Sequence, residues 1–453
     1  MAGGSCDRRA ACHETPRETL MAMKFLVLLL AVAFVPFAHA APPNIVVLFA
    51  DDAGYADFGF QKHADPALAA LTPNITRLAK EGVVFSQAYV SGAVCSPSRA
   101  GAMTGRYQQR FGHETNIPQN YMKGGLPLTE KFIGDRMKPL GYTTGLIGKW
   151  HLGYPADYHP MKRGYDHFFG LLQGSRPYFP LKKIQPHTSF FDDGKPTPEG
   201  GYTTDRIGDG ACRFLDANKD QPFFLFVSFT APHGPLQAKP EVLAALKNIP
   251  DGKRRKYAGL VKSLDDNCGK ILAKLDSLGL AKNTLVIFSN DNGGQTQTGA
   301  VNTPLRGHKG EVVEGGIRVP MAMRFPGKIT PGTTVDTPVI TLDWFPTFIE
   351  LAGGKPDPAW KLDGQSLLPL VSGKPEAFPA RTLHWRTNGK KGPIAIREGD
   401  WKLLYRDRSE PELYNLATDI SEATNLAAGN PGKTKELRAK MDAWETGLPE
   451  PLW

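Results

Sequence analysis

The chain has 453 residues, of which 41% are hydrophobic and 22% charged. This composition is typical of a globular protein, excludes a fibrous or disordered chain, and leaves room for one large domain and a smaller one. The formal net charge of +9 fits an anionic substrate, but the basic residues are scattered and only residues 253–256 form a cluster, so we expect no nucleic-acid binding.

The first 40 residues carry the features of a secretory signal. A short basic segment at 21–24 precedes an apolar run at 25–38, and Ala38-His39-Ala40 matches a small-x-small cleavage site. The run is too short to span a bilayer comfortably. We therefore expect residues 1–40 to be a leader that is removed after Ala40. The mature protein would then be secreted or periplasmic, with no membrane span left.

Four apolar runs beyond the leader are predicted to be strands. Each run is continuous rather than alternating, which is typical of strands that are buried on both faces of a parallel sheet. Helical patterns lie between and after the runs, and this alternation indicates a doubly wound α/β domain. We predict an α/β fold in which helices sandwich a large, mostly parallel sheet. The predicted strands are 44–50, 143–148, 222–229 and 284–289, and the predicted helices are 76–81, 128–140, 205–217, 257–278 and 342–352.

The pattern changes after Gly354. A loop at 355–362 contains two prolines, three short strand-like segments follow, and a polar helix is expected at 434–444. We expect residues 41–354 to form the main α/β domain. Residues 355–453 would form a C-terminal α+β subdomain, a small antiparallel sheet with a helix. Its predicted strands are 382–386, 392–397 and 401–405.

The mature chain holds three cysteines, Cys95, Cys212 and Cys268. An oxidising compartment would allow a disulfide between Cys212 and Cys268, but both lie in helix-like sequence and nothing fixes their separation. We therefore expect two buried thiols.

Polar residues follow each predicted strand, and ligands of such sheets bind outside the carboxyl ends of the strands. Asp51 and Asp52 follow the first strand, and Asp291 and Asn292 follow the last. We expect all four to meet at one site. Three carboxylates and an amide are ligands for a hard divalent cation, Ca²⁺ or Mg²⁺, and not for zinc. The alternative is that each pair is an ordinary turn.

The segment Cys95-Ser96-Pro97-Ser98-Arg99 is predicted to begin a helix, because Pro97 suits a first helical turn. The free N–H groups and the dipole of a helix N-terminus favour negative charge, and Arg99 lies one turn from Cys95. For a lone cysteine the alternative is a half-buried thiol. The five residues together favour an anion site.

Two further strand ends supply a cation and imidazoles. Lys149 and His151 follow the second strand, and because residues i and i+2 of an extended segment point the same way, both can face one anion. His233 follows the third strand and suits a general acid near neutral pH. For each residue taken alone, a surface lysine or a packed histidine is the alternative.

These residues resemble, in order, the motifs of the type I sulfatases, the formylglycine-dependent family of the alkaline phosphatase superfamily. Residues 95–99 are similar to its Cys-x-Pro-Ser-Arg signature, Gly105-Arg106 extends the match, and the resemblance covers nearly all of the mature chain. It implies that a formylglycine-generating enzyme oxidises Cys95 to formylglycine. In the family, one hydroxyl of its hydrated form coordinates the metal and attacks sulfur, and the other later expels sulfate.

The resemblance also implies roles for the other residues. A divalent cation, with Ca²⁺ expected and Mg²⁺ open, would be bound by the carboxylates, the amide and residue 95. The matching lysine and histidine of the family bind the sulfate and support the formylglycine, and Lys309 matches a lysine that contacts the sulfate and the leaving oxygen. The expected metal ligands are Asp51, Asp52, Cys95, Asp291 and Asn292, and the expected catalytic residues are Cys95, Arg99, Lys149, His151, His233 and Lys309.

The leading hypothesis is a sulfuric ester hydrolase, arylsulfatase-like, that acts on a sulfated small molecule or glycan, with a sulfated carbohydrate favoured. One alternative is a phosphate or phosphonate ester hydrolase of the same superfamily. Another is a non-catalytic binder of sulfated glycans, which the intact Cys95 and Arg99 argue against. Substrate contacts are open for loops 112–116, 176–178 and 384–386, which carry aromatic, imidazole or polar groups.

Overall fold

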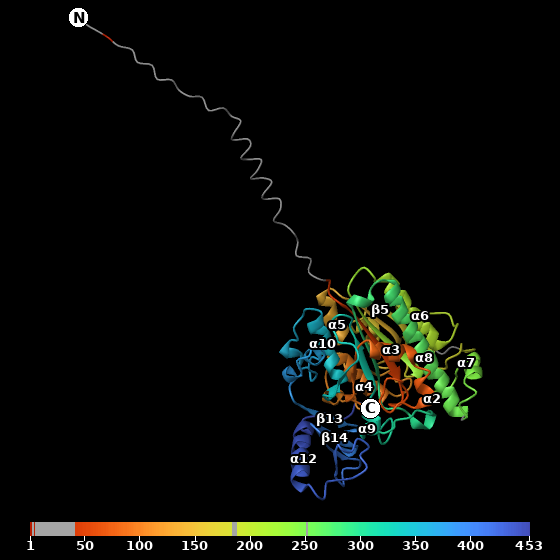
Figure 1. The fold of residues 1–453 in the computed structure, drawn as a ribbon, viewed down its shortest axis with the longest axis vertical. Coiled ribbons are helices and arrows are strands. Elements are labelled where there is room, and N and C mark those ends of the chain that lie inside the picture. Colours follow the sequence, from red (N-terminus) through yellow and green to blue (C-terminus); the bar gives the residue numbers. More distant parts are fainter. Residues whose placement is uncertain (2–3, 5–40, 184–187, 251) are drawn as a thin grey trace. The chain divides into compact units, whose positions relative to one another are not determined.

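A ten-stranded sheet forms the centre of the protein, in the strand order β11-β2-β10-β9-β1-β8-β4-β5-β6-β7 (Figure 1). The computed structural model describes residues 1, 4, 41–183, 188–250 and 252–453, and Pro42–Trp453 form one compact unit. The predicted signal segment lies outside the described residues, so its removal stays a prediction. No helix among the described residues has both the length and the apolar character needed to cross a bilayer.

The sheet is mostly parallel, which confirms the prediction. β1 (Asn44–Asp51) runs parallel to both of its neighbours, β8 (Phe223–Pro232) and β9 (Thr284–Asn290). β4 (Thr143–Lys149) runs parallel to β8 on its other side. Every residue of β1, β8 and β9 is buried, which explains why these strands are continuous apolar runs. The other strands of this sheet are β2 (Val83–Phe85), β5 (His167–Leu171), β6 (Phe191–Asp192), β7 (Lys195–Pro196), β10 (Met321–Arg324) and β11 (Thr333–Val335), and a separate pair is β3 (Ala88–Tyr89) with β12 (Val339–Ile340).

Helices cover both faces of the sheet. Successive residues of β1 enter different core layers: Leu48 belongs to the layer of α6 and α8, whereas Phe49 contacts Trp344 of α10 edge-on at 5.5 Å between ring centroids. Figure 1 shows α6 and α8 on one side and α5 and α10 on the other. The helices are α2 (Pro66–Ala69), α3 (Pro73–Lys80), α4 (Cys95–Thr104), α5 (Ile133–Met137), α6 (Thr203–Ala217), α7 (Pro240–Ala245), α8 (Gly252–Ser277), α9 (Glu314–Ile317), α10 (Trp344–Leu351), α11 (Leu368–Val371) and α12 (Pro431–Glu445).

The C-terminal region forms the predicted small antiparallel sheet, with one strand more than expected. The strand order is β13-β14-β15-β16, and α12 packs on this sheet through Leu437 and Met441. The fourth strand escaped prediction because it is short and only its two central residues are buried. The bounds of the strands are β13 (Thr382–Arg386), β14 (Ile394–Glu398), β15 (Trp401–Tyr405) and β16 (Glu412–Asn415). The division into 41–354 and 355–453 stays a prediction.

One predicted helix is shorter than expected. The pattern at 128–140 predicted a single helix, but α5 begins only at Ile133 and a 3₁₀ turn completes it at Lys138–Leu140. The Asp135 carboxylate accepts the backbone N–H of Phe132 at 2.9 Å, which caps the helix at that point. Cys212 and Cys268 are buried free thiols, as expected.

Candidate functional site

The predicted strand ends meet at one edge of the sheet. β1 ends at Asp51, β4 at Lys149 and β9 at Asn290, and because β9, β1, β8 and β4 are parallel neighbours, their carboxyl ends lie together. Two residues just beyond these ends have left-handed backbones, Asp52 with φ of 66° and His151 with φ of 60°. Such conformations are strained for residues other than glycine and concentrate at functional sites.

Cys95 lies at the centre of this edge, at the first residue of α4. Its side chain is 1% exposed, and its Sγ lies 3.4 Å from Asp51 Oδ1 and 3.3 Å from Lys309 Nζ. Burial, helped by the charge of Asp51, raises the pKa of the Cys95 thiol. The unmodified side chain is therefore a protonated thiol that donates to Asp51, which makes it a poor nucleophile.

The acidic residues surround Cys95 as a compact group. Ligand atoms of Asp51, Asp52, Cys95 and His233 all lie within 4.8 Å of one another. The Asp291 carboxylate accepts the backbone N–H of Asp52 at 3.2 Å. All three carboxylates are fully buried. Because hard cations bind clusters of buried carboxylate oxygens, this donor set fits Ca²⁺ or Mg²⁺.

Asn292 provides an independent indication of a ligand. Its Nδ2 donates to Asp52 Oδ1 at 2.8 Å, which places the amide against the acidic group. Its Oδ1 is buried and has no hydrogen-bond partner among the residues that the structure describes. A buried carbonyl oxygen without a partner is costly, and a cation would satisfy it.

Three cations balance the three carboxylates. Lys149 Nζ lies 2.5 Å from Asp51 Oδ2, Lys309 Nζ lies 2.8 Å from the Asp52 carboxylate, and Arg99 Nη2 lies 2.8 Å from Asp291 Oδ2. Burial alone would raise the pKa of Asp51, but the charges of Lys149 and His233 outweigh it and lower that pKa. Burial and the charge of Asp51 raise the pKa of Asp291 to about 6. Shifted pKa values in a buried ionic cluster are typical of functional sites.

The two histidines differ in their environment. His151 is 6% exposed, and burial together with the charges of Lys149 and Arg99 lowers its pKa well below the usual value. Its imidazole is therefore neutral at neutral pH. The His233 side chain is 21% exposed, with Nδ1 at 2.7 Å from the Gly234 carbonyl and Nε2 at 3.5 Å from Asp52 Oδ2. The hydrogen on Nδ1 is thus committed to the backbone, and Nε2 is the nitrogen that faces the site.

Some supporting contacts of the site were not predicted from the sequence. Ser228, within β8, accepts a hydrogen bond from Arg99 Nη1. Ser96 Oγ donates to the backbone carbonyl of His151 at 2.7 Å and lies 2.6 Å from His113 Nε2, so the hydrogen of this second contact comes from His113. Only the position of Ser228 near a strand end hinted at its role, because these contacts join residues far apart in the sequence.

The three loops considered for substrate contact direct important polar groups inward. Glu114 and Arg386 are 2% exposed and form an ion pair with each other. The Arg176 guanidinium pairs with Glu199 at 2.6 Å. The alternative to substrate contact was that these are exposed loop residues, but Glu114, Arg176 and Arg386 are instead buried and paired inside the protein.

The chain is similar to known proteins over nearly its full described length. A family model described as Sulfatase matches residues 43–354, and one described as N-sulphoglucosamine sulphohydrolase, C-terminal, matches residues 308–445. The N-acetylgalactosamine-6-sulfatase of Mus musculus is 33% identical over 90% of this chain and 80% of its own length. Arylsulfatase J of Mus musculus is 32% identical over 91% of this chain and 77% of its own length. The crystal structure of Ps i-CgsB in complex with k-i-k-neocarrahexaose has a TM-score of 0.86 at 37% identity and covers 91% of this chain and 94% of that one.

Proposed function

The chain belongs to the sulfatase family, and from this premise we propose that it hydrolyses a sulfated carbohydrate, with residue 95 as the nucleophile. The observation that carries the proposal is the position of Cys95, buried at a helix N-terminus between a carboxylate group and Lys309. A buried thiol with a raised pKa is unsuited to attack as it stands. The arrangement therefore favours a nucleophile that is made by chemical modification of Cys95.

In the proposed reaction, a formylglycine-generating enzyme and a two-electron oxidant convert Cys95 to an aldehyde: the Cβ–Sγ bond breaks, the sulfur leaves as hydrogen sulfide, and water supplies the carbonyl oxygen. A second water then adds to give a geminal diol. One hydroxyl oxygen of the diol forms a bond to sulfur while the bond from sulfur to the sugar oxygen breaks. The sugar alcohol leaves with a proton, and residue 95 carries the sulfate. Loss of the proton from the second hydroxyl then re-forms the C=O bond and expels sulfate, which a plain thiol could not do.

The residues around position 95 would divide the work. Lys149 and Lys309 place ammonium groups where negative charge grows on the sulfate and the leaving oxygen. His233 presents Nε2 from a partly exposed side chain, which suits donation of a proton to the leaving alcohol. Arg99 holds Asp291 and Asp51 in place from within α4, at 2.8 and 3.6 Å. His151 would bind the sulfate as a neutral imidazole.

The proposed metal site uses Asp51, Asp52, Asp291, Asn292 and the modified residue 95. The buried carboxylates and the unpartnered Asn292 Oδ1 support an oxygen-binding cation, for which we propose Ca²⁺, with Mg²⁺ as the other candidate. Once bound, the cation would supply positive charge that favours ionisation of the attacking hydroxyl. A chelator should abolish sulfate release, and Ca²⁺ or Mg²⁺ should restore it. Full activity after exhaustive chelation would overturn the metal assignment.

The carbohydrate substrate rests on the relatives and on charge. One curated relative is named for N-acetylgalactosamine-6-sulfate, and the Ps i-CgsB structure contains a neocarrahexaose. The net charge, +9 for the full chain and +8 without residues 1–40, would favour approach of a sulfated glycan. We further propose that the protein acts outside the cytoplasm after removal of residues 1–40, with residues 41–354 as the catalytic domain and 355–453 as its subdomain.

The test compares the sulfate and phosphate esters of one sugar alcohol. The protein is produced together with the modifying enzyme, and released sulfate or phosphate is measured, with the Cys95→Ala variant as the blank. We expect release of sulfate at a far higher kcat/KM than release of phosphate. Preference for the phosphate ester would favour the alternative hydrolase, and tight binding of both esters without turnover would favour a glycan-binding protein.

A further inference from the structure

The loop from Arg306 to Glu314, here called the Lys309 loop, carries one catalytic cation into the site. Lys309 Nζ lies 2.8 Å from the Asp52 carboxylate and 3.3 Å from Cys95 Sγ. The two ends of the loop meet where the N–H of Gly315 donates to the carbonyl of Arg306 at 2.7 Å. A loop that is closed in this way moves as a unit, so whatever fixes its ends also fixes Lys309.

The Glu314 end is fixed by a fully buried ionic cluster. Lys402 Nζ, on β15 of the C-terminal sheet, lies 2.8 Å from Glu314 Oε1 and 2.9 Å from Glu422 Oε1. Glu422 also accepts the backbone N–H of Glu314 at 2.7 Å. The side chains of Lys402, Glu314 and Glu422 are all 0% exposed. A buried charge needs a partner to offset its lost hydration. Lys402 contacts both carboxylates, and Arg318 Nη1 gives Glu314 a second cation at 3.2 Å.

The Arg306 end is fixed by the same sheet. Arg306 Nη2 lies 3.0 Å from Glu412 Oε2, and Nη1 lies 3.3 Å from the Tyr414 hydroxyl, both on β16. Tyr414 donates in turn to Glu412 at 2.6 Å. The guanidinium also lies over the Tyr414 ring, 5.1 Å from its centroid. Two neighbouring strands of the small sheet thus hold the two ends of the Lys309 loop.

We infer that the C-terminal sheet positions Lys309 for catalysis, with Arg306, Glu412 and Lys402 as positioning residues that act through the Lys309 loop. The inference rests on the proposed sulfatase function and goes beyond it, because it gives the C-terminal region a part in the reaction. A flexible lysine side chain loses rotamer freedom when it binds, so a fixed backbone limits this cost. The sheet itself supplies no atom to the reacting group.

The Arg306→Gln variant is the primary test, because Arg306 is 30% exposed, and the buried Glu422, which it approaches at 3.9 Å, keeps Lys402 as its partner at 2.9 Å. Lys309 would contact the leaving oxygen, so its position matters most for a poor leaving group. We expect kcat on a sugar sulfate to fall about tenfold, since displacements on the order of 1 Å can cost up to 10²-fold. A nitrophenyl sulfate, with a good leaving group, should lose less than about twofold.

The matched control is Arg406→Gln, which removes the other arginine partner of Glu412 and leaves the Lys309 loop untouched. It should retain the wild-type kcat on both esters. Combining Arg306→Gln with Lys309→Met should give no loss beyond that of Lys309→Met alone, because both changes remove one function. A general folding defect would instead lower kcat equally on both substrates, and its effect would add to the loss from Lys309→Met.

The outcomes separate this inference from the proposed function. If the wild type releases sulfate and Arg306→Gln matches Arg406→Gln on the sugar sulfate, the positioning role is wrong and the sulfatase function stands. Equal losses on both esters, or additive losses with Lys309→Met, also overturn it. If the wild type releases no sulfate from either ester, both proposals fall.

Discussion

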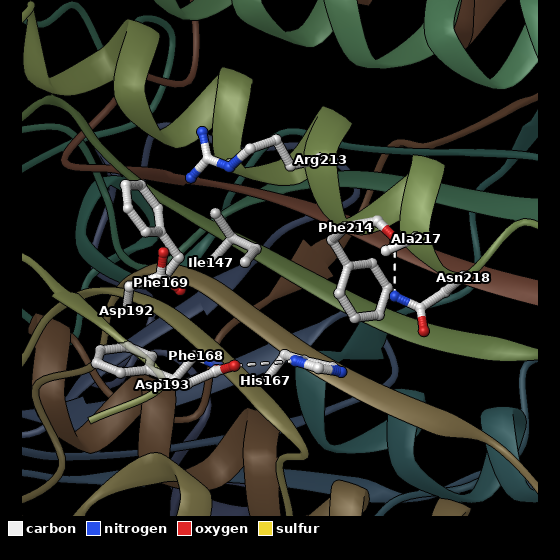
Figure 2. Close-up of a pocket in the computed structure, with 11 residues that line it drawn as sticks. Ile147, His167, Phe168, Phe169, Asp192, Asp193, Arg213, Phe214, Ala217 and Asn218 are labelled. Atoms are coloured by element: carbon white, nitrogen blue, oxygen red, sulfur yellow. Dashed lines mark hydrogen bonds and ion pairs between the residues drawn. The ribbon is translucent and has the colours of Figure 1, made fainter. Parts of the chain in front are cut away.

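Two regions of the large sheet differ in whether their charged side chains are buried: the carboxyl ends of its parallel strands and an aromatic cavity beside α6. At the carboxyl ends, Asp51 and Lys149 are fully buried and paired at 2.5 Å. On the face of the sheet that α6 covers, a cavity of about 150 Å³ opens where β5 starts, and the rings of Phe169 and Phe214 line it (Figure 2). At its rim the His167 imidazole lies 3.2 Å from the Asp193 carboxylate, and these two side chains are 46% and 43% exposed.

The difference shows where the protein buries charged side chains. A single strand, β4, reaches both regions: Ile147 lines the aromatic cavity and Lys149, two residues later, joins the ionic cluster. Burying a charge costs several kcal/mol per ion unless partners compensate for it. We therefore expect the carboxyl-end cluster to serve the proposed chemistry and the aromatic cavity to serve packing. Substitutions at the first region should change activity, and those at the second should change stability.

The largest effect is expected from Cys95→Ala, which removes the precursor of the nucleophile. We expect kcat for sulfate release to fall by more than about 10⁴-fold, as is typical when a covalent nucleophile is removed. Cys212→Ala is the matched control, because Cys212 is another buried thiol and lies on α6. Comparable activity of the Cys95→Ala variant and the wild type would refute a covalent role for residue 95.

Lys309→Met should have the next largest effect. The ammonium group is lost while most of the side-chain volume stays, and kcat should fall about 10²- to 10³-fold. Lys282→Met, an exposed lysine just before β9 at the amino-end edge, should leave kcat unchanged. Equal losses of kcat in the two variants, measured by steady-state kinetics, would contradict a special role for the carboxyl-end edge.

Phe214→Ala tests the aromatic cavity, which Phe214 lines. Phe214 is 5% exposed and contacts Phe223 edge-on, at 5.8 Å between ring centroids. Removing the ring should lower the free energy of unfolding by about 3 kcal/mol in chemical denaturation. The kcat/KM below the melting transition should be unchanged. A loss of activity without a loss of stability would mean that this cavity takes part in function.

The smallest effect concerns His113, which burial keeps uncharged in the folded state. Burial lowers the pKa of His113 to about 3, against about 6.5 in an unfolded chain. The unfolded state therefore binds one more proton between these values, and the contribution to stability falls as pH falls, by about 1.4 kcal/mol per pH unit. His113→Asn should flatten the dependence of the free energy of unfolding on pH between about pH 6 and about pH 4, measured by chemical denaturation at steps of about one pH unit. An unchanged slope would contradict the assignment.

The local features of the site could be predicted from the sequence because they depend on strand ends and a helix start. Asp51, Lys149 and Asp291 follow buried apolar runs, and Pro97 marks the first turn of α4. Parallel strands bring such ends together, which made their convergence predictable. Their catalytic and metal-binding roles stay predictions.

The contacts that support the site could not be predicted in the same way. Lys402 meets Glu314 across 88 positions of sequence, and Arg386 meets Glu114 across 272. No periodicity or capping pattern encodes such pairs, because they depend on how two sheets pack. The short strand β16 was missed for a related reason, since it is recognised only by its pairing with β15.

The most direct test of the account is the mass of the peptide that contains position 95, in protein that has been shown to release sulfate. The account predicts the mass of the aldehyde or its hydrate, and a specific activity that rises in proportion to the modified fraction. Protein that releases sulfate at its full rate with an unmodified thiol at position 95 would contradict it.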